Sequence, residues 1–148
     1  MYRTRRIRLS LGVATLAFGL LTTTTLGVVT ASAVAKPVLK VTPATGLTNH
    51  RTVKVTGTGF KPKEQVYLVE CLATASGGSQ CNIAGAVPVT ISAKGVFPVT
   101  TFKVVTGAIG KGKCGTKASN LKSCALSAGT ASGTDTAVAR ITFKLAKG

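Results

Sequence analysis

After residue 36 the chain alternates between apolar and polar side chains in short segments, and no stretch carries a sustained helical period. These segments are rich in β-branched residues and are bounded by Gly, Pro, Asn and Ser, a pattern typical of strands. The expected strands are 38–42, 52–56, 64–71, 87–92, 96–105 and 137–145. Six or seven strands separated by turns about every 8–12 residues predict an all-β sandwich of Greek-key type.

Segment 65–71 departs from this alternation because its apolar residues run continuously. Val66 and Leu68 can enter the core, so Tyr67, Val69 and Cys71 would line a second surface. An apolar outer face beside a loop could form the floor of a ligand cleft. The alternative is that the neighbouring loop folds over this face and buries it as a small satellite cluster.

Residues 1–35 have the order of a secretory signal peptide. An arginine-rich start is followed by an apolar stretch over 9–29 and by two Ala-x-Ala sites, which end at Ala33 and Ala35. We therefore expect export and cleavage near Ala33 or Ala35, leaving one domain of residues 36–148. The alternative is that the uncleaved apolar stretch, which is long enough to span a bilayer, remains as a membrane anchor.

The charge of the chain is almost entirely positive, with 19 Lys and Arg against 3 Asp and Glu in 148 residues, a net charge of +16. Cleavage after Ala35 removes four arginines, which leaves 15 basic residues against 3 acidic ones and a net charge of +12. A hydrophobic content of 45% and a mean hydropathy of +0.36 exclude a disordered polycation.

The four cysteines, Cys71, Cys81, Cys114 and Cys124, all follow the predicted cleavage sites. Each local pair encloses nine residues, whereas structural zinc sites use much tighter pairs, so no metal site is expected. Export through an oxidising compartment favours two disulfides. Three connectivities are possible, and local pairing of Cys71 with Cys81 and of Cys114 with Cys124 is favoured because each segment can close its own loop.

The sequence does not favour an enzyme. It contains one histidine, three acids and none of the nucleophile-elbow, zinc-protease or phosphate-loop motifs. Disulfide pairing would also leave no nucleophilic thiol. We therefore expect no catalytic residue and no required cofactor.

Several segments together resemble a known family. Residues 41–47 and 52–60 are similar to the opening of the neocarzinostatin and macromomycin apoproteins, and Cys71 and Cys81 match the spacing of that family's first disulfide. Residues 89–95 resemble its central hairpin and residues 141–143 its closing strand, so the resemblance covers about 36–145. It implies a seven-stranded immunoglobulin-like Greek-key sandwich with a small disulfide-bearing β subdomain.

The resemblance also implies a function, because the family sequesters an enediyne chromophore in a cleft and delivers it to DNA as an antibiotic. The first hypothesis is therefore a secreted carrier of a hydrophobic small molecule. The resemblance implies that this molecule is a non-covalently bound, enediyne-like chromophore, and we expect the carrier to be monomeric. The candidate lining residues, with the last two at the lip of the cleft, are Tyr67, Val69, Cys71, Ala73, Cys81, Ala108 and Ile109.

The sequence departs from the family at several positions. Ala73 stands where neocarzinostatin has a cleft tryptophan, Ala108 aligns with a cleft phenylalanine, and Glu70 replaces a glutamine. The second cysteine pair encloses nine residues rather than four, and the better-known family members are acidic. Loss of aromatic surface weakens the match to an enediyne but leaves the expected fold unaffected.

The second hypothesis is a basic exported protein that binds DNA or an anionic cell-envelope polymer without a chromophore. Lysine-rich loops attract such polymers by counterion release, without reading sequence. The alternative is a charge that only keeps the domain soluble. The candidate contacts are Lys61, Lys63, Lys94, Lys103, Lys111, Lys113, Lys117 and Lys122.

Overall fold

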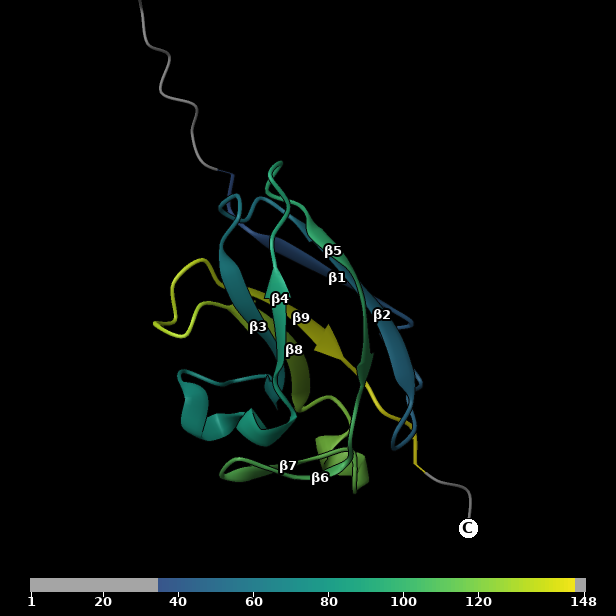
Figure 1. Ribbon diagram of the computed structural model, residues 1–148. Coiled ribbons are helices and arrows are strands. Elements are labelled where there is room, and N and C mark those ends of the chain that lie inside the picture. Colours follow the sequence, from purple (N-terminus) through teal and green to yellow (C-terminus); the bar gives the residue numbers. More distant parts are fainter. Residues whose placement is uncertain (1–34, 146–148) are drawn as a thin grey trace, which may run out of the picture. The chain divides into compact units, whose positions relative to one another are not determined.

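The structure, a computed structural model, describes residues 35–145 and is built from β-strands with three single turns of 3-10 helix (Figure 1). The predicted signal peptide lies outside the described residues, apart from Ala35. The strands are β1 (Val38–Thr42), β2 (Thr52–Thr58), β3 (Gln65–Leu72), β4 (Val87–Thr90), β5 (Phe97–Lys103), β6 (Gly107–Ile109), β7 (Gly112–Cys114), β8 (Cys124–Gly129) and β9 (Ala137–Ile141). The short helices are η1 (Gly78–Gln80), η2 (Ile83–Gly85) and η3 (Ala118–Asn120).

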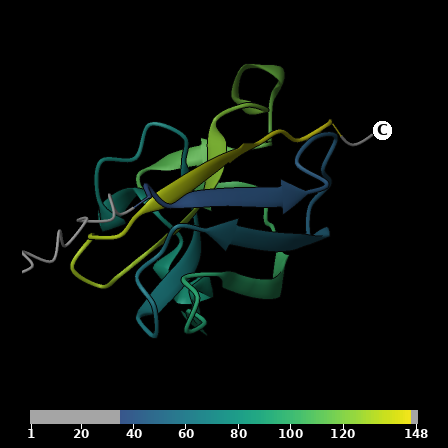
Figure 2. The same cartoon turned by 90° about the horizontal axis from the view of Figure 1, so that it is seen from above.

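Seven strands form two antiparallel sheets, in the orders β1-β2-β5 and β4-β3-β8-β9. The strands β6 and β7 pair with each other as a separate ribbon. Strands β1 and β9 belong to different sheets but lie side by side, and a parallel bridge between Leu47 and Phe143 extends this contact (Figure 2). The prediction of an immunoglobulin-like sandwich with a small β subdomain is confirmed.

The core lies between the two sheets because each strand turns alternate side chains inward. Val53 and Val55 of β2 are buried, as are Val66 and Leu68 of β3, which confirms the inward face expected for these strands. Phe97, at the start of β5, is the largest side chain buried to this extent, and its ring packs 5.7 Å from that of Phe60 between centroids.

The predicted strands differ from the observed ones at several places, and the short strands β6 and β7 were not among those predicted. Strand β9 ends at Ile141 rather than continuing to residue 145, because the backbone amides of Thr142 and Lys144 turn to the carbonyls of Ala44 and Leu47. The central strand β8 was not predicted at all. Its sequence, CALSAG, has neither alternation nor β-branched residues, and most of its residues are buried between β3 and β9.

Both predicted disulfides are present, Cys71–Cys81 and Cys114–Cys124, and each closes a local loop. The first ties the loop after β3 back to that strand, and the second joins the end of β7 to the start of β8. Within the described residues, no helix is long and apolar enough to cross a membrane.

Candidate ligand cavity

A cavity of about 600 Å³ lies on the outer face of the four-stranded sheet. Its floor is built where three neighbouring strands place outward-facing residues in register. Val69 of β3 pairs with Ser127 of β8, which pairs with Val138 of β9, and Tyr67 pairs with Gly129. The small residues of β8 leave the floor low between Tyr67 and Val69 on one side and Val138 on the other. The unpredicted strand β8 therefore provides the depth of the cavity.

One wall of the cavity is the loop of residues 73–86 that contains η1 and η2. The disulfide Cys71–Cys81 fixes this loop to β3, with the two Cα atoms 3.9 Å apart. Within the loop, the side-chain oxygen of Gln80 accepts a hydrogen bond of 2.8 Å from the backbone amide of Ser76. The loop stands beside the outer face of β3 and does not close over it, since Tyr67 remains 37% exposed. The apolar face of β3 is thus open to a cavity and does not form a closed satellite cluster.

The opposite wall is the hairpin loop between β8 and β9. The Thr130 hydroxyl accepts a hydrogen bond of 3.0 Å from the amide of Thr134, and the two backbones are joined by a second bond from Thr130 N–H to the Thr134 carbonyl. Asp135 anchors the hairpin to the turn after β2 by accepting a bond of 2.8 Å from the amide of Lys61. Both ends of this wall are therefore held by hydrogen bonds.

Five of the seven candidate lining residues meet at the cavity: Tyr67, Val69, Cys71, Ala73 and Cys81. The other two do not. Ala108 and Ile109 belong to β6, and Ile109 is fully buried in the core rather than placed at the lip. The structure therefore does not bring these two residues to the cavity, because the β6–β7 ribbon packs against the cavity loop at Ser79 and Gln80.

Gly110, between β6 and β7, is the point at which the ribbon contacts the cavity loop most closely. It has a φ of +51°, and a Cβ at this position would collide with the carbonyl oxygen of Ser79 in η1. Only glycine allows the ribbon to approach the loop so closely in this conformation.

The sequence reasoning missed the lining residues of β8, β9 and the surrounding loops. Val138 had a usable signal, since it is an apolar residue on the polar face of a predicted strand. The small residues of β8 had none, because they follow no period. The lining residues that were missed are Leu72, Ala75, Ser76, Gly77, Gly78, Ile83, Ala86, Ser127, Gly129, Thr130, Ala131, Gly133, Thr136 and Val138.

The chemistry of the cavity lining is neutral. Within residues 35–145, no Lys, Arg, His, Asp or Glu lines it, although the chain carries 19 Lys and Arg residues. Tyr67 is the single aromatic residue among the described residues that line it, and hydroxyl groups of Ser76, Ser127, Thr130 and Thr136 add polar side chains. Such a lining can hold an uncharged apolar molecule and orient it by a few hydrogen bonds.

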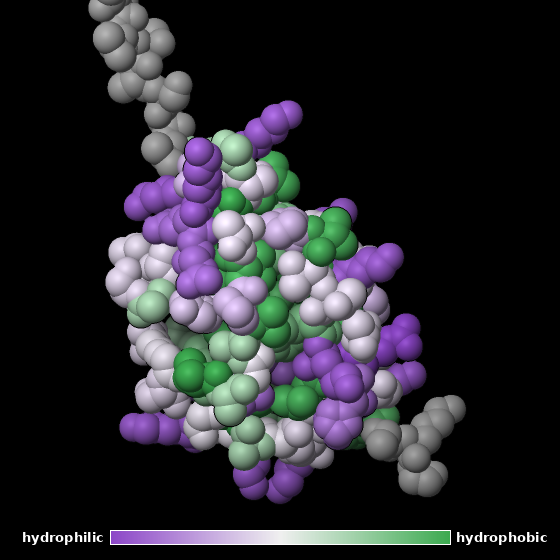
Figure 3. All heavy atoms as spheres, in the orientation of Figure 1, coloured by the Kyte–Doolittle hydropathy of each residue, from purple (hydrophilic) through white to green (hydrophobic). Residues whose placement is uncertain are grey.

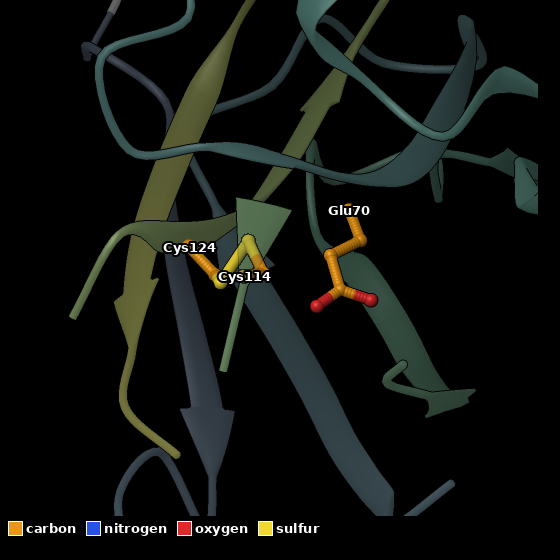
Figure 4. A group of neighbouring side chains, drawn as sticks. All are labelled: Glu70, Cys114 and Cys124. Atoms are coloured by element: carbon orange, nitrogen blue, oxygen red, sulfur yellow. A yellow bond between two sulfur atoms is a disulfide. The ribbon is translucent and has the colours of Figure 1, made fainter. Parts of the chain in front are cut away.

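Behind the floor, Glu70 points into the core beside the disulfide Cys114–Cys124 (Figure 4). One carboxyl oxygen, Oε2, accepts a bond of 2.8 Å from the amide of Val105, while Oε1 has no hydrogen-bond partner among the described residues. Burial raises the pKa of the Glu70 carboxyl from 4.5 to about 7, and the bond from Val105 opposes this shift. Among the described residues, Glu70 is the only polar or charged residue whose side chain is buried.

Glu70, Cys114 and Cys124 also form the only group of three or more described His, Cys, Asp or Glu residues whose potential ligand atoms all lie within 4.8 Å of one another. The two sulfur atoms are bonded to each other and offer no thiolate, so this group does not have the donors of a metal site.

The eight candidate polyanion contacts are all exposed but do not form one surface. Lys61, Lys63 and Lys94 lie on two adjoining turns, where the amide of Lys63 bonds to the carbonyl of Ser92. Lys103 ends β5. The remaining four lie on the β6–β7 ribbon and the η3 loop, at the other end of the molecule in Figure 1: Lys111, Lys113, Lys117 and Lys122.

The sequence is similar to those of known proteins of one family. Residues 39–143 match the neocarzinostatin family. The chain is 35% identical to macromomycin of Streptomyces macromomyceticus over 72% of its length and 76% of that protein. It is 32% identical to the antitumor antibiotic C-1027 apoprotein of Streptomyces globisporus, over 70% of the chain and 80% of the relative.

Solved structures agree with these matches. The structure of macromomycin aligns with a TM-score of 0.56 at 32% identity, covering 73% of this chain and 99% of that one. The solution structure of apokedarcidin aligns with a TM-score of 0.50 at 27% identity, covering 74% and 100%. The fold, the two disulfides and the sequence matches agree, and the chain belongs to the neocarzinostatin family, whose members are carrier apoproteins and not enzymes.

Proposed function

We propose that this protein is an exported carrier that sequesters an uncharged, hydrophobic small molecule in the cavity beside β3. The observation that carries the proposal is the neutral lining of a cavity of about 600 Å³ in a strongly basic protein. A charged ligand would find no partner there, whereas an apolar one would be removed from water by Val69, Val138 and Ile83. The volume is within the range of about 300–1,000 Å³ that is common for small-molecule sites.

Family membership supports a chromophore of the enediyne type as the ligand, because a relative is by name the apoprotein of an antitumor antibiotic. The lining favours a chromophore with little aromatic surface, since Ala73 occupies the position of the cleft tryptophan of neocarzinostatin. Each aromatic pair that is missing removes about 1 kcal/mol of stacking. We propose a ligand that is held mainly by apolar burial and by hydroxyl groups at the walls.

A neutral dye tests the cavity without knowledge of the natural ligand. Nile red should bind the purified protein with a blue shift and a rise in its fluorescence. Val138→Asp places a carboxylate on the cavity floor without touching the core, since Val138 is 58% exposed. A bound dye would remove this carboxylate from water, which costs more than about 1.4 kcal/mol. A tenfold change in Kd corresponds to about 1.4 kcal/mol, so the affinity for Nile red should fall at least tenfold.

Val99→Asp is the matched control. Val99 is also an exposed valine on a strand, 71% exposed, but it lies on β5 of the other sheet, outside the cavity. It makes the same change of charge and should leave Nile red binding unchanged. Equal loss of binding in both variants, or no binding by the unchanged protein, would contradict the carrier proposal. If the dye binds as expected, native mass spectrometry of protein from its native source gives the mass of the natural ligand. An absorption spectrum shows whether that ligand is a chromophore, because a chain without Trp absorbs little above about 300 nm by itself.

A further inference from the structure

Glu70 joins the floor of the cavity to the segments that form and support its wall. Its backbone carbonyl accepts a bond of 2.8 Å from the amide of Asn82, in the cavity loop of residues 73–86. Its carboxyl oxygen Oε2 accepts a bond of 2.8 Å from the amide of Val105, two residues before the β6–β7 ribbon. The residues on either side of Glu70 in β3 both line the cavity. A change at this carboxyl can therefore reach the ligand site through the ribbon and the cavity loop.

The ribbon that begins after Val105 holds the cavity loop in place. The two backbones approach so closely at Gly110 that a Cβ there would collide with Ser79 and Gln80 of the loop. A shift of the ribbon away from β3 removes this contact. The disulfide Cys71–Cys81 would still tether the loop, so the wall would loosen without unfolding.

No charged side chain faces the Glu70 carboxyl from the opposite sheet. The buried residues of β1, β2 and β5 are all apolar, and the lysines of these strands are exposed. The segment 104–106, which follows β5 and supplies the bond from Val105, contains no titratable residue. In Figure 3 the hydrophilic side chains project mainly at the margins of the molecule, with hydrophobic ones between them.

The elements around β3 provide no counter-ion either. Neither β4, β6, η1 nor η2 contains a titratable residue, and Arg140 of β9 is exposed. Lys113 of β7 is exposed on the side opposite to Cys114, and the disulfide-bonded Cys114 and Cys124 do not titrate. Glu64 lies just before the other end of β3. Burial and the bond from Val105 are accordingly the two influences on the pKa of Glu70, without a contribution from a neighbouring charge.

An ionised Glu70 would be poorly solvated in this position. Oε1 has no hydrogen-bond partner among the described residues, and the disulfide beside it has no hydrogen to donate (Figure 4). A buried carboxylate that accepts a single hydrogen bond is unfavourable compared with a hydrated one. Water is the partner that remains, and it reaches the carboxylate if the segment at Val105 moves away from β3.

We propose that ionisation of Glu70 releases the ligand, because the β6–β7 ribbon then shifts away from β3 and no longer supports the cavity loop. The protonated carboxyl favours the closed arrangement, in which no charge is buried. The ionised carboxylate favours an open arrangement in which water reaches it, and the ligand binds the closed arrangement better. The inference rests on the proposed carrier function. The carrier retains its ligand in acidic surroundings and gives it up as the pH rises towards neutrality.

Proton linkage gives the pH range of this release. The pKa of Glu70 is about 7 in the closed arrangement and returns towards 4.5 when the carboxyl is hydrated. Opening therefore releases a proton between these two values. The affinity should fall as the pH rises from about 4.5 to about 7 and should change no further above this range. The difference between the two pKa values limits the fall to about 300-fold, tenfold for each pH unit.

Nile red titrations at about pH 4.5 and about pH 8 test this inference with a neutral dye, and the Kd of the unchanged protein should be at least about threefold higher at the higher pH. Glu70→Gln has no proton to lose at this position and can still accept the bond from Val105. Its Kd should be the same at both pH values and close to that of the unchanged protein at the lower pH. Glu64→Gln is the matched control, because it removes a carboxylate outside the core, and it should keep the pH dependence.

Hydrogen–deuterium exchange of the protein without dye gives an independent measurement of the ribbon. At about pH 8, residues 105–114 should exchange faster in the unchanged protein than in Glu70→Gln, whereas at about pH 4.5 the two should exchange alike. Equal exchange at the higher pH, or a Kd that rises with pH as much in Glu70→Gln as in the unchanged protein, would overturn the inference. Absence of Nile red binding at both pH values would instead contradict the carrier function, on which release depends, and the exchange difference would still test the movement of the ribbon.

Discussion

The buried carboxyl of Glu70 makes the stability of this protein depend on pH, and Glu70→Gln should remove that dependence. The pKa of Glu70 rises from 4.5 to about 7 on folding, so the folded state holds the proton more tightly than the unfolded state. The resulting stabilisation is complete below about pH 4.5, is lost as the pH rises to about 7, and changes no further above it. A shift of this size corresponds to about 3 kcal/mol.

The glutamine variant keeps the shape of the side chain and can still accept the bond from the amide of Val105. Each form leaves a donor group unpaired at the position of Oε1, the O–H of the protonated carboxyl in the unchanged protein and the NH2 of the amide in the variant. The two proteins should therefore be similar in stability near pH 4, whereas at pH 8 the variant should be more stable by about 3 kcal/mol.

Urea unfolding followed by far-UV circular dichroism at several pH values between 4 and 8 measures this difference. Glu64→Gln is the control, because it removes one carboxylate outside the core and leaves Glu70 in place, so the fall in stability between pH 4.5 and 7 should persist. Parallel pH profiles of Glu70→Gln and the unchanged protein, or a variant that is less stable at pH 8, would refute the reasoning.

Three further predictions concern the cavity wall. Replacing Cys71 and Cys81 together by serine should lower the free energy of unfolding by about 3 kcal/mol and weaken Nile red binding; unchanged binding would show that the loop needs no tether. Gly110→Ala should lower the free energy of unfolding by about 1–2 kcal/mol and weaken binding, because its Cβ displaces Ser79, and dye titration with unchanged affinity would contradict this. Ala73→Trp should strengthen the binding of a neutral aromatic dye about fivefold, and its fluorescence, the only Trp signal in the chain, should be quenched by the dye.

Part of the cavity followed from the sequence of β3 alone. A strand that is apolar on both faces predicts one face in the core and one against something else, and the structure has Val66 and Leu68 inside with Tyr67 and Val69 outside. The same alternation places Glu70 inward with Val66 and Leu68. Its burial was not anticipated, because a charged side chain is rarely fully buried without a partner.

The sequence by itself determined the strand class, the family resemblance and the local disulfides, since these depend on alternation, on motif order and on short loops that close themselves. The tertiary structure decided what depends on strand pairing. It placed the small residues of β8 beneath the cavity, put Ile109 in the core, and brought Glu70 next to the amide of Val105. No local pattern records which strands become neighbours, because register is fixed by the burial of the whole sheet at once.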